Sequence, residues 1–100
     1  MTILANNPST GLGPLTAVPG GSTNGTALGS PPAGTVGARL YLPPGASVTF
    51  TIAVAQSTGA PANTFTASQS GTGPNWDEAF SAGQMLYVTA TVGSPMFRWY

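Results

Sequence analysis

The sequence contains no histidine, no cysteine and no lysine, and only four of its 100 residues are charged. Zinc, copper, haem and iron–sulfur centres are bound mainly by imidazole and thiolate groups, so the chain lacks the usual ligands for them. A nucleophilic serine would have no histidine partner, and there is no lysine to form a Schiff base. We therefore predict a protein that is not an enzyme and holds no cofactor and no metal.

The four charges are two arginines and two acids, so the formal net charge is zero. Two arginines cannot form the basic surface that nucleic acids require, and a neutral chain is not attracted to an anionic membrane. The apolar runs are shorter than the roughly 20 residues of a membrane span, and the N-terminus lacks the basic region of a signal peptide. Because the chain starts with Met1, we expect a complete product that is made without export.

The small number of charged residues also affects how readily copies of the chain associate. Charge repulsion does little to keep copies of such a chain apart, and the cores of protein interfaces are themselves poor in charge. The composition favours a subunit of an assembly over a free protein whose surface is solvated by serine, threonine, asparagine and glutamine. A small domain without disulfide or metal often gains further burial by forming oligomers. We therefore expect a multimer.

Glycine, proline, serine and threonine are abundant and crowd the N-terminal third. Breakers recur there every five or six residues, so no helix of ordinary length fits. Only residues 15–18 and 26–28 have the composition of short strands. We predict that residues 1–35 form an extended arm, with one or two short strands lying on a partner or on the core. A disordered tail is the alternative, although such tails are usually rich in charge.

From residue 36 onward, apolar and polar side chains alternate, which is typical of strands with one buried face. The pattern predicts long strands at 47–55 and 84–92, with shorter ones at 38–42 and 62–68. Pro44 and Gly45 suit the two central positions of a type II turn, and residues 70–75 are expected to form a loop. No stretch has useful helical periodicity. Residues 36–100 are therefore predicted to form an all-β domain, an antiparallel β-sandwich. Its predicted core lies on one face of the two long strands: Val48, Phe50, Ile52, Val54, Leu86, Val88 and Val92.

The two acidic residues are neighbours, Asp77 and Glu78. Adjacent side chains of a strand point to opposite faces, so these two cannot act as an acid–base pair. Two carboxylates are also few for a calcium site. We interpret them as surface groups that pair with Arg39 or Arg98. Residues 76–80 fit a strand by their alternation and a single helical turn by their capping pattern, and both remain open.

Aromatic residues gather at the C-terminus, where residues 96–100 include three. Because fraying would expose a large apolar area, we expect Phe97 and Trp99 to be buried in the sandwich or between subunits. A second group could in principle stack on a sugar ring, although packing in the core or at a subunit interface is favoured for it. This group consists of Tyr41, Trp76, Met85 and Tyr87.

The order of several short motifs resembles one protein family. Pro-Ala-Gly-Thr-Val at 32–36 and Arg-Leu-Tyr-Leu-Pro-Pro-Gly-Ala-Ser at 39–47 precede the strand Val-Thr-Phe-Thr-Ile-Ala-Val-Ala at 48–55. Asn-Thr-Phe-Thr-Ala at 63–67 and Phe-Ser-Ala-Gly-Gln-Met-Leu-Tyr-Val at 80–88 follow. The series resembles compact jelly-roll domains of tailed-bacteriophage virions, found in capsid decoration (cement) proteins and in fibre or appendage heads.

The resemblance implies a β-sandwich of jelly-roll type, commonly a homotrimer, without catalytic apparatus. It implies a structural virion protein, a decoration subunit that binds the major capsid protein at the outer capsid surface and stabilises it. Such a protein would be assembled in the host cytoplasm. The alternative is a receptor- or carbohydrate-binding head, or another fibre or tail component. The candidate capsid or subunit contacts are apolar residues of the arm and of the C-terminus: Ile3, Leu4, Leu12, Leu15, Val18, Leu28, Phe97, Trp99 and Tyr100.

Overall fold

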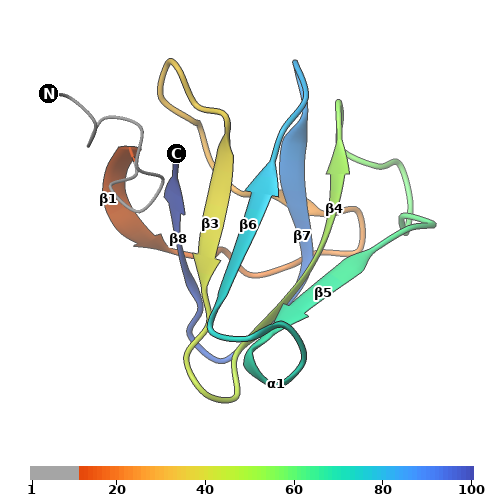
Figure 1. The fold of residues 1–100 in the computed structure, drawn as a ribbon. Helices are drawn as coiled ribbons and strands as arrows, with labels where there is room; N and C mark the ends of the chain where they lie inside the picture. Colours follow the sequence, from red (N-terminus) through yellow and green to blue (C-terminus); the bar gives the residue numbers. More distant parts are fainter. Residues whose placement is uncertain (1–11) are drawn as a thin grey trace, which may run out of the picture.

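Glycine and proline turns divide residues 12–100, the part of the chain that the computed structural model describes, into short strands and one helical turn (Figure 1). The protein is all-β, as predicted. No helix in this part of the chain is long and apolar enough to cross a membrane. The elements are β1 (Leu12–Ala17), β2 (Thr26–Ala27), β3 (Gly37–Tyr41), β4 (Ser47–Ala53), β5 (Phe65–Ser68), α1 (Gln69–Thr72), β6 (Asn75–Ala79), β7 (Met85–Val92) and β8 (Met96–Trp99).

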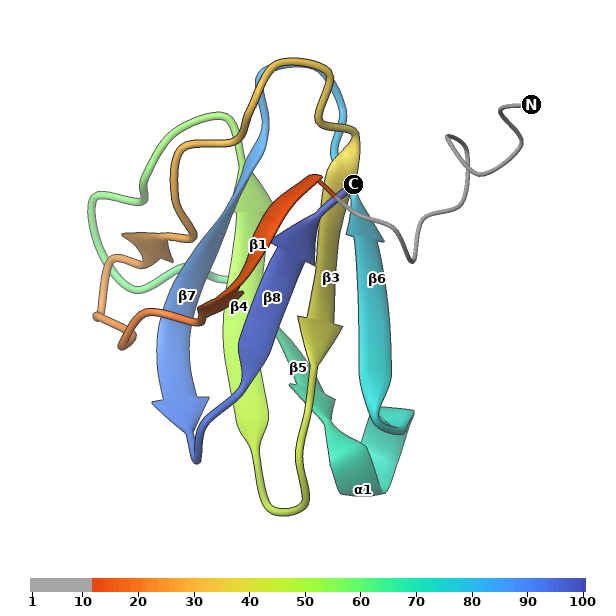
Figure 2. The same ribbon diagram turned by 90° about the vertical axis from the view of Figure 1, so that its left-hand side faces the viewer.

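The strands form two antiparallel sheets, one behind the other in Figure 2. Sheet 1 has the order β1-β8-β3-β6, and sheet 2 has the order β2-β7-β4-β5. Within residues 12–100, β4 and β5 are the only consecutive strands in the same sheet, and every other connection crosses between the sheets. Strands that are far apart in the sequence therefore become neighbours.

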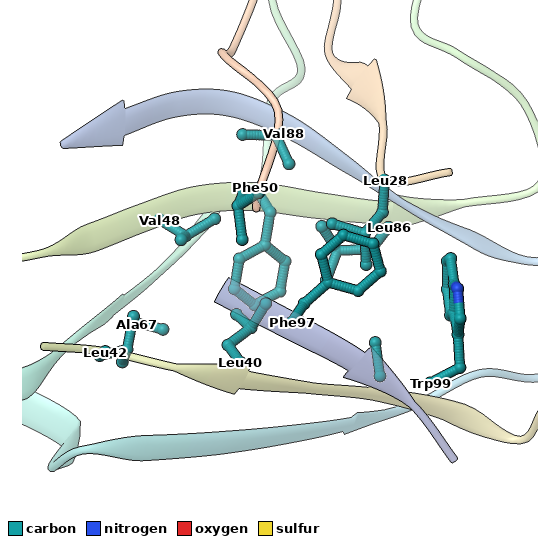
Figure 3. Close-up of a cluster of buried hydrophobic side chains, with 12 residues drawn as sticks. Leu28, Leu40, Leu42, Val48, Phe50, Ala67, Leu86, Val88, Phe97 and Trp99 are labelled. Atoms are coloured by element: carbon teal, nitrogen blue, oxygen red, sulfur yellow. The ribbon is translucent and has the colours of Figure 1, made fainter. Parts of the chain in front are cut away.

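The core lies between the two sheets and is built from the inward side chains of their central strands (Figure 3). Leu40 and Phe97 come from sheet 1, whereas Phe50 and Leu86 come from sheet 2. Burial of each such side chain contributes about 1.5–3 kcal/mol to folding. The rings of Phe97 and Trp99 meet edge-on, with 5.1 Å between their centroids. Both are buried in this core, so the predicted burial of the two C-terminal aromatics is confirmed.

A β-bulge changes which residues of β7 face the core. Thr49 of β4 is paired with Ala90, but the next residue, Phe50, is paired with Val88, so Thr89 is an extra residue. Alternation is reversed beyond a bulge of this kind. Val92 therefore points outward and is 55% exposed, and the prediction that it lies in the core was wrong.

Two other predicted core residues lie at the far end of β4. Ile52 is only partly buried and packs against the edge of the core. Val54 follows the last residue of β4 and is 72% exposed, so its assignment to the core was wrong. The remaining four predicted core residues are fully buried: Val48, Phe50, Leu86 and Val88.

The described part of the predicted arm completes both sheets. β1 pairs with β8 at the edge of sheet 1, and β2 pairs with β7 at the edge of sheet 2. Val18 and Leu28 are buried in the core, at 7% and 4% exposure. Residues 12–35 thus lie in the same sandwich as residues 36–100, and an arm separate from the domain is not confirmed over this stretch. The two short strands expected at 15–18 and 26–28 are present on the core as β1 and β2, with somewhat different bounds.

The turn between β3 and β4 has the predicted type. The amide of Ala46 donates to the carbonyl of Pro43 at 2.9 Å, and Gly45 has a φ of 83°, as the third residue of a type II turn requires. Of the two alternatives for residues 76–80, the strand is present as β6. The helical turn α1 lies just before it, where a loop was expected, and is capped by the hydroxyl of Ser68, which accepts from the amide of Gly71.

Candidate functional site

All four charged residues lie in sheet 1, and three of them form a row across its outer surface. Arg98 of β8, Arg39 of β3 and Asp77 of β6 occupy paired positions on neighbouring strands. Arg39 donates from Nε and Nη2 to the two carboxylate oxygens of Asp77, at 2.5 and 2.8 Å. This hydrogen-bonded guanidinium lowers the pKa of Asp77, and the carboxylate raises the pKa of Arg39.

The other charged side chains also bind within the chain. Arg98 donates from Nε to the carbonyl oxygen of Gly13 at 3.0 Å, which joins β8 to β1. Glu78 accepts from the indole Nε1 of Trp76 at 2.9 Å. Asp77 and Glu78 lie on opposite faces of β6, so they form no acid–base pair, and Asp77 is held by Arg39. The two arginines thus fasten the outer strands of sheet 1, β6 and β1, to its central strands.

Tyr100 lies against the start of β3. The amides of Val36 and Gly37 donate to its carbonyl oxygen, and its own amide donates to the carbonyl of Gly37 at 3.0 Å. A Cβ at Gly37 would come within 2.2 Å of the main-chain oxygen of Glu78 and 2.9 Å of the Tyr100 ring, so glycine lets both β6 and this ring approach closely. Burial raises the pKa of the Tyr100 hydroxyl, and the carboxylates of Asp77 and Glu78 raise it further.

The outer surface of sheet 2 contains none of the charged residues. Threonine is its most frequent residue, and the hydroxyls of Thr49 and Thr66 lie 3.2 Å apart across β4 and β5. Tyr87 is paired with Thr51 of β4 and with Ala27 of β2. We call this surface the neutral face, and its residues are Ser47, Thr49, Thr51, Ala53, Thr66, Tyr87, Ala90 and Val92.

An open pocket of about 460 Å³ adjoins the neutral face at one end of the sandwich. Three connections contribute to its lining: the β2–β3 loop, the β6–β7 turn and the start of the β4–β5 loop. All three lie at the upper end of the sandwich in Figures 1 and 2. We call it the end pocket. Its lining consists of Ala27, Pro31, Thr35, Val54, Phe80, Ser81, Ala82, Gly83, Gln84, Met85 and Tyr87.

The candidate contact residues lie in different environments. Four are inside the core and cannot touch a partner unless the sandwich opens: Val18, Leu28, Phe97 and Trp99. Leu12 is partly buried against the core, and Tyr100 is half-buried. Leu15 is 46% exposed on β1 and is accessible to a partner. Ile3 and Leu4 lie outside the described residues.

The four side chains considered for sugar stacking are not brought together. Tyr41 and Trp76 belong to sheet 1, and Trp76 packs edge-on against Phe50 at 6.3 Å between ring centroids. Met85 and Tyr87 belong to sheet 2, and both line the end pocket. The other residues of this pocket were not foreseen, because they come from loops that are far apart in the sequence.

The described part of the chain brings together few side chains that could bind a metal. No group of three or more histidine, cysteine, aspartate or glutamate side chains gathers within residues 12–100.

Comparisons of the chain with protein-family models, with curated proteins and with solved structures found no match. The function of the chain must therefore be argued from its own residues.

Proposed function

We propose that this protein is a structural subunit of a virion, a decoration (cement) protein that binds the outer surface of the capsid and stabilises it. One observation carries the proposal: every charged residue belongs to sheet 1 and is engaged within the chain, whereas the neutral face is free of charge. Interface cores are depleted of charged residues, so the neutral face has the composition of a contact surface. Its partner in this proposal is the major capsid protein.

We also infer that the sandwich is a jelly roll. In this fold the chain doubles back at its middle, so that the first strand pairs with the last, the second with the seventh, and so on. The pairs β1–β8, β2–β7, β3–β6 and β4–β5 support this topology. Eight-stranded sandwiches of this type are common in viral capsid proteins and in lectins.

The oligomer in this proposal is a homotrimer. A chain of 10.0 kDa with zero net charge has a small core and little electrostatic repulsion between copies. Sedimentation of the purified protein at micromolar concentration would then give a mass of about 30 kDa, three times 10.0 kDa. A clean 10 kDa monomer would count against the trimer, but not against capsid binding.

The alternative function is a receptor- or carbohydrate-binding head, or another component of a fibre or tail. Copy number separates the two: hundreds of copies per particle are expected of a decoration protein, and a few dozen at most of an appendage. Mass spectrometry of purified virions gives this number directly.

Binding to undecorated particles tests the neutral face. Ala90→Arg places a cation on this face, and Ala79→Arg places the same side chain at an equally exposed strand position of sheet 1. We expect Ala90→Arg to lose most of its occupancy and Ala79→Arg to bind like the wild type. Wild-type binding should change little between low and high salt, since screening weakens only charge-driven contacts. Full binding by Ala90→Arg would refute the role of the neutral face.

A further inference from the structure

We propose that the end pocket is a binding site for a neutral sugar, one hexopyranose unit of a glycan. At about 460 Å³, its volume falls within the range of roughly 300–1,000 Å³ that is typical of small-molecule sites. The proposal concerns the isolated protein and does not depend on capsid binding.

The apolar part of the lining includes two aromatic side chains, Phe80 and Tyr87. Phe80 packs edge-on against the buried Trp99, with 6.4 Å between ring centroids, which fixes the side of the pocket that it forms. Tyr87 packs closely against Gly25, because a Cβ at Gly25 would come within 2.7 Å of the Tyr87 Cβ. Aromatic rings with a polar tip suit a ligand that has both apolar and polar faces, as a pyranose ring does.

The polar part of the lining comes from the β6–β7 turn. The amide of Gln84 donates to the carbonyl of Ser81 at 3.0 Å, and the amide of Ser81 donates to Oε1 of Gln84 at 3.0 Å. These reciprocal bonds close the turn before any ligand arrives. Because Gln84 uses its carbonyl oxygen in this way, its side-chain NH₂ group presents two donors to a sugar hydroxyl.

The β2–β3 loop, which also lines the pocket, is held by hydrogen bonds. Thr35 donates to the carbonyl of Pro32 from both its amide and its hydroxyl, at 3.2 and 2.7 Å, and Pro31 restricts the chain just before. Phe80 is tied to this loop by its amide, which donates to the carbonyl of Val36 at 2.8 Å. A pocket whose walls are fixed in advance loses little entropy when it binds a ligand.

The charge of the lining decides the class of ligand. None of the lining residues is charged, so a carboxylated, sulfated or phosphorylated ligand would meet no counter-ion. A purely apolar ligand would leave the donors of Gln84 without partners. A neutral, hydroxyl-rich ring satisfies both conditions.

Amide NMR of the ¹⁵N-labelled full chain tests the proposal. The probes are methyl glycosides of glucose, galactose, mannose and N-acetylglucosamine, with N-acetylneuraminic acid as the charged comparison. We expect at least one neutral glycoside to shift the amides of residues 81–87 with a dissociation constant of about 1–10 mM, the strength of a single small contact area. N-acetylneuraminic acid should bind at least about tenfold more weakly.

Two variants and a matched control locate the site. Tyr87→Ala should weaken binding about tenfold, whereas Tyr41→Ala, a half-buried tyrosine of sheet 1, should leave it unchanged. Gln84→Met keeps the side-chain length but removes both the NH₂ donors and the Oε1 that accepts from the Ser81 amide. It should weaken binding similarly, which covers the case that Tyr87→Ala fails to fold. The proposal is overturned if no neutral glycoside shifts these amides at about 100 mM. Shifts that persist in both pocket variants, or equal binding of N-acetylneuraminic acid, would also overturn it.

Discussion

Replacement of Gly21 by alanine tests whether the segment between β1 and β2 belongs to the folded core. This glycine lies against the bulge of β7, and a Cβ on it would overlap the backbone of Thr89 and Ala90. Backbone atoms within a sheet cannot swing aside as the end of a flexible side chain can. The alanine variant can therefore fold only if residues 19–22 move away from β7.

The cost of this movement follows from the bonds that it breaks. The amide of Ser22 donates to the carbonyl of Val88 at 3.3 Å, and the hydroxyl of Thr91 donates to the carbonyl of Pro19 at 2.7 Å. At about 0.5–1.5 kcal/mol for each hydrogen bond, their loss costs about 1–3 kcal/mol. Residual crowding adds about 1 kcal/mol. We expect Gly21→Ala to lower the free energy of unfolding by about 2–4 kcal/mol.

Gly20 provides a matched control one residue earlier. A Cβ there would have no atom within 4 Å, so Gly20→Ala should change stability by less than about 1 kcal/mol. Thermal unfolding followed by tryptophan fluorescence measures both variants. At about 4–8 °C per kcal/mol for a domain of this size, Gly21→Ala should lower Tm by roughly 8–32 °C. Equal Tm values for the two variants would refute the reasoning, because they would mean that residues 19–22 do not pack on β7.

Three further predictions concern the sheets themselves. Val88→Ala should lower the free energy of unfolding by about 2 kcal/mol, whereas Val92→Ala, beyond the bulge, should lower it by less than about 0.5 kcal/mol. Urea unfolding measures both values, and equal losses would contradict the bulge. The lowered pKa of Asp77 means that its contribution to stability is present above the pKa of the unfolded chain and is lost as the pH falls through the folded pKa. Wild type should therefore lose a small stability advantage over Asp77→Asn as the pH falls below about 4, and parallel pH profiles would contradict the pairing. Deletion of residues 96–100 removes β8 from the middle of sheet 1 and should give insoluble protein; a soluble product with native near-ultraviolet circular dichroism would contradict this.

Alternation in the sequence predicted the fold class and the central strands, because it is a local property. Each long strand is recognisable from its own residues, and the Pro44-Gly45 turn from two more. The bulge at Thr89 has no such mark, since Val-Thr-Ala-Thr-Val reads as one continuous strand. A single extra residue reversed the faces beyond it, so Val92 was misplaced although its strand was correct.

The N-terminal third could not be placed because its partners are remote. β1 reads as a broken, turn-rich segment, and its structure depends on β8, about eighty residues further along the chain. Val18 and Leu28 also depend on remote residues. The sequence predicts them as contacts for a partner, but their side chains are buried in the core of their own chain. The end pocket is likewise assembled from separate connections, and of its lining the sequence marks only Met85 and Tyr87 as candidate ligand contacts.

The edge strands of both sheets are protected from pairing with other chains, although this chain has few charges. Exposed edge strands invite pairing with any other strand, and proteins block them with charge or by keeping them short. In sheet 1, the edge strand β6 carries both acids, and Arg98 holds the edge strand β1 to β8. In sheet 2, the edge strands are short, with two residues in β2 and four in β5. The two acids thus lie on an exposed edge strand, where uncontrolled association would begin, and the outer surface of sheet 2 is neutral. If this surface binds the capsid, as we propose, its specificity depends on the fit of side chains and not on charge.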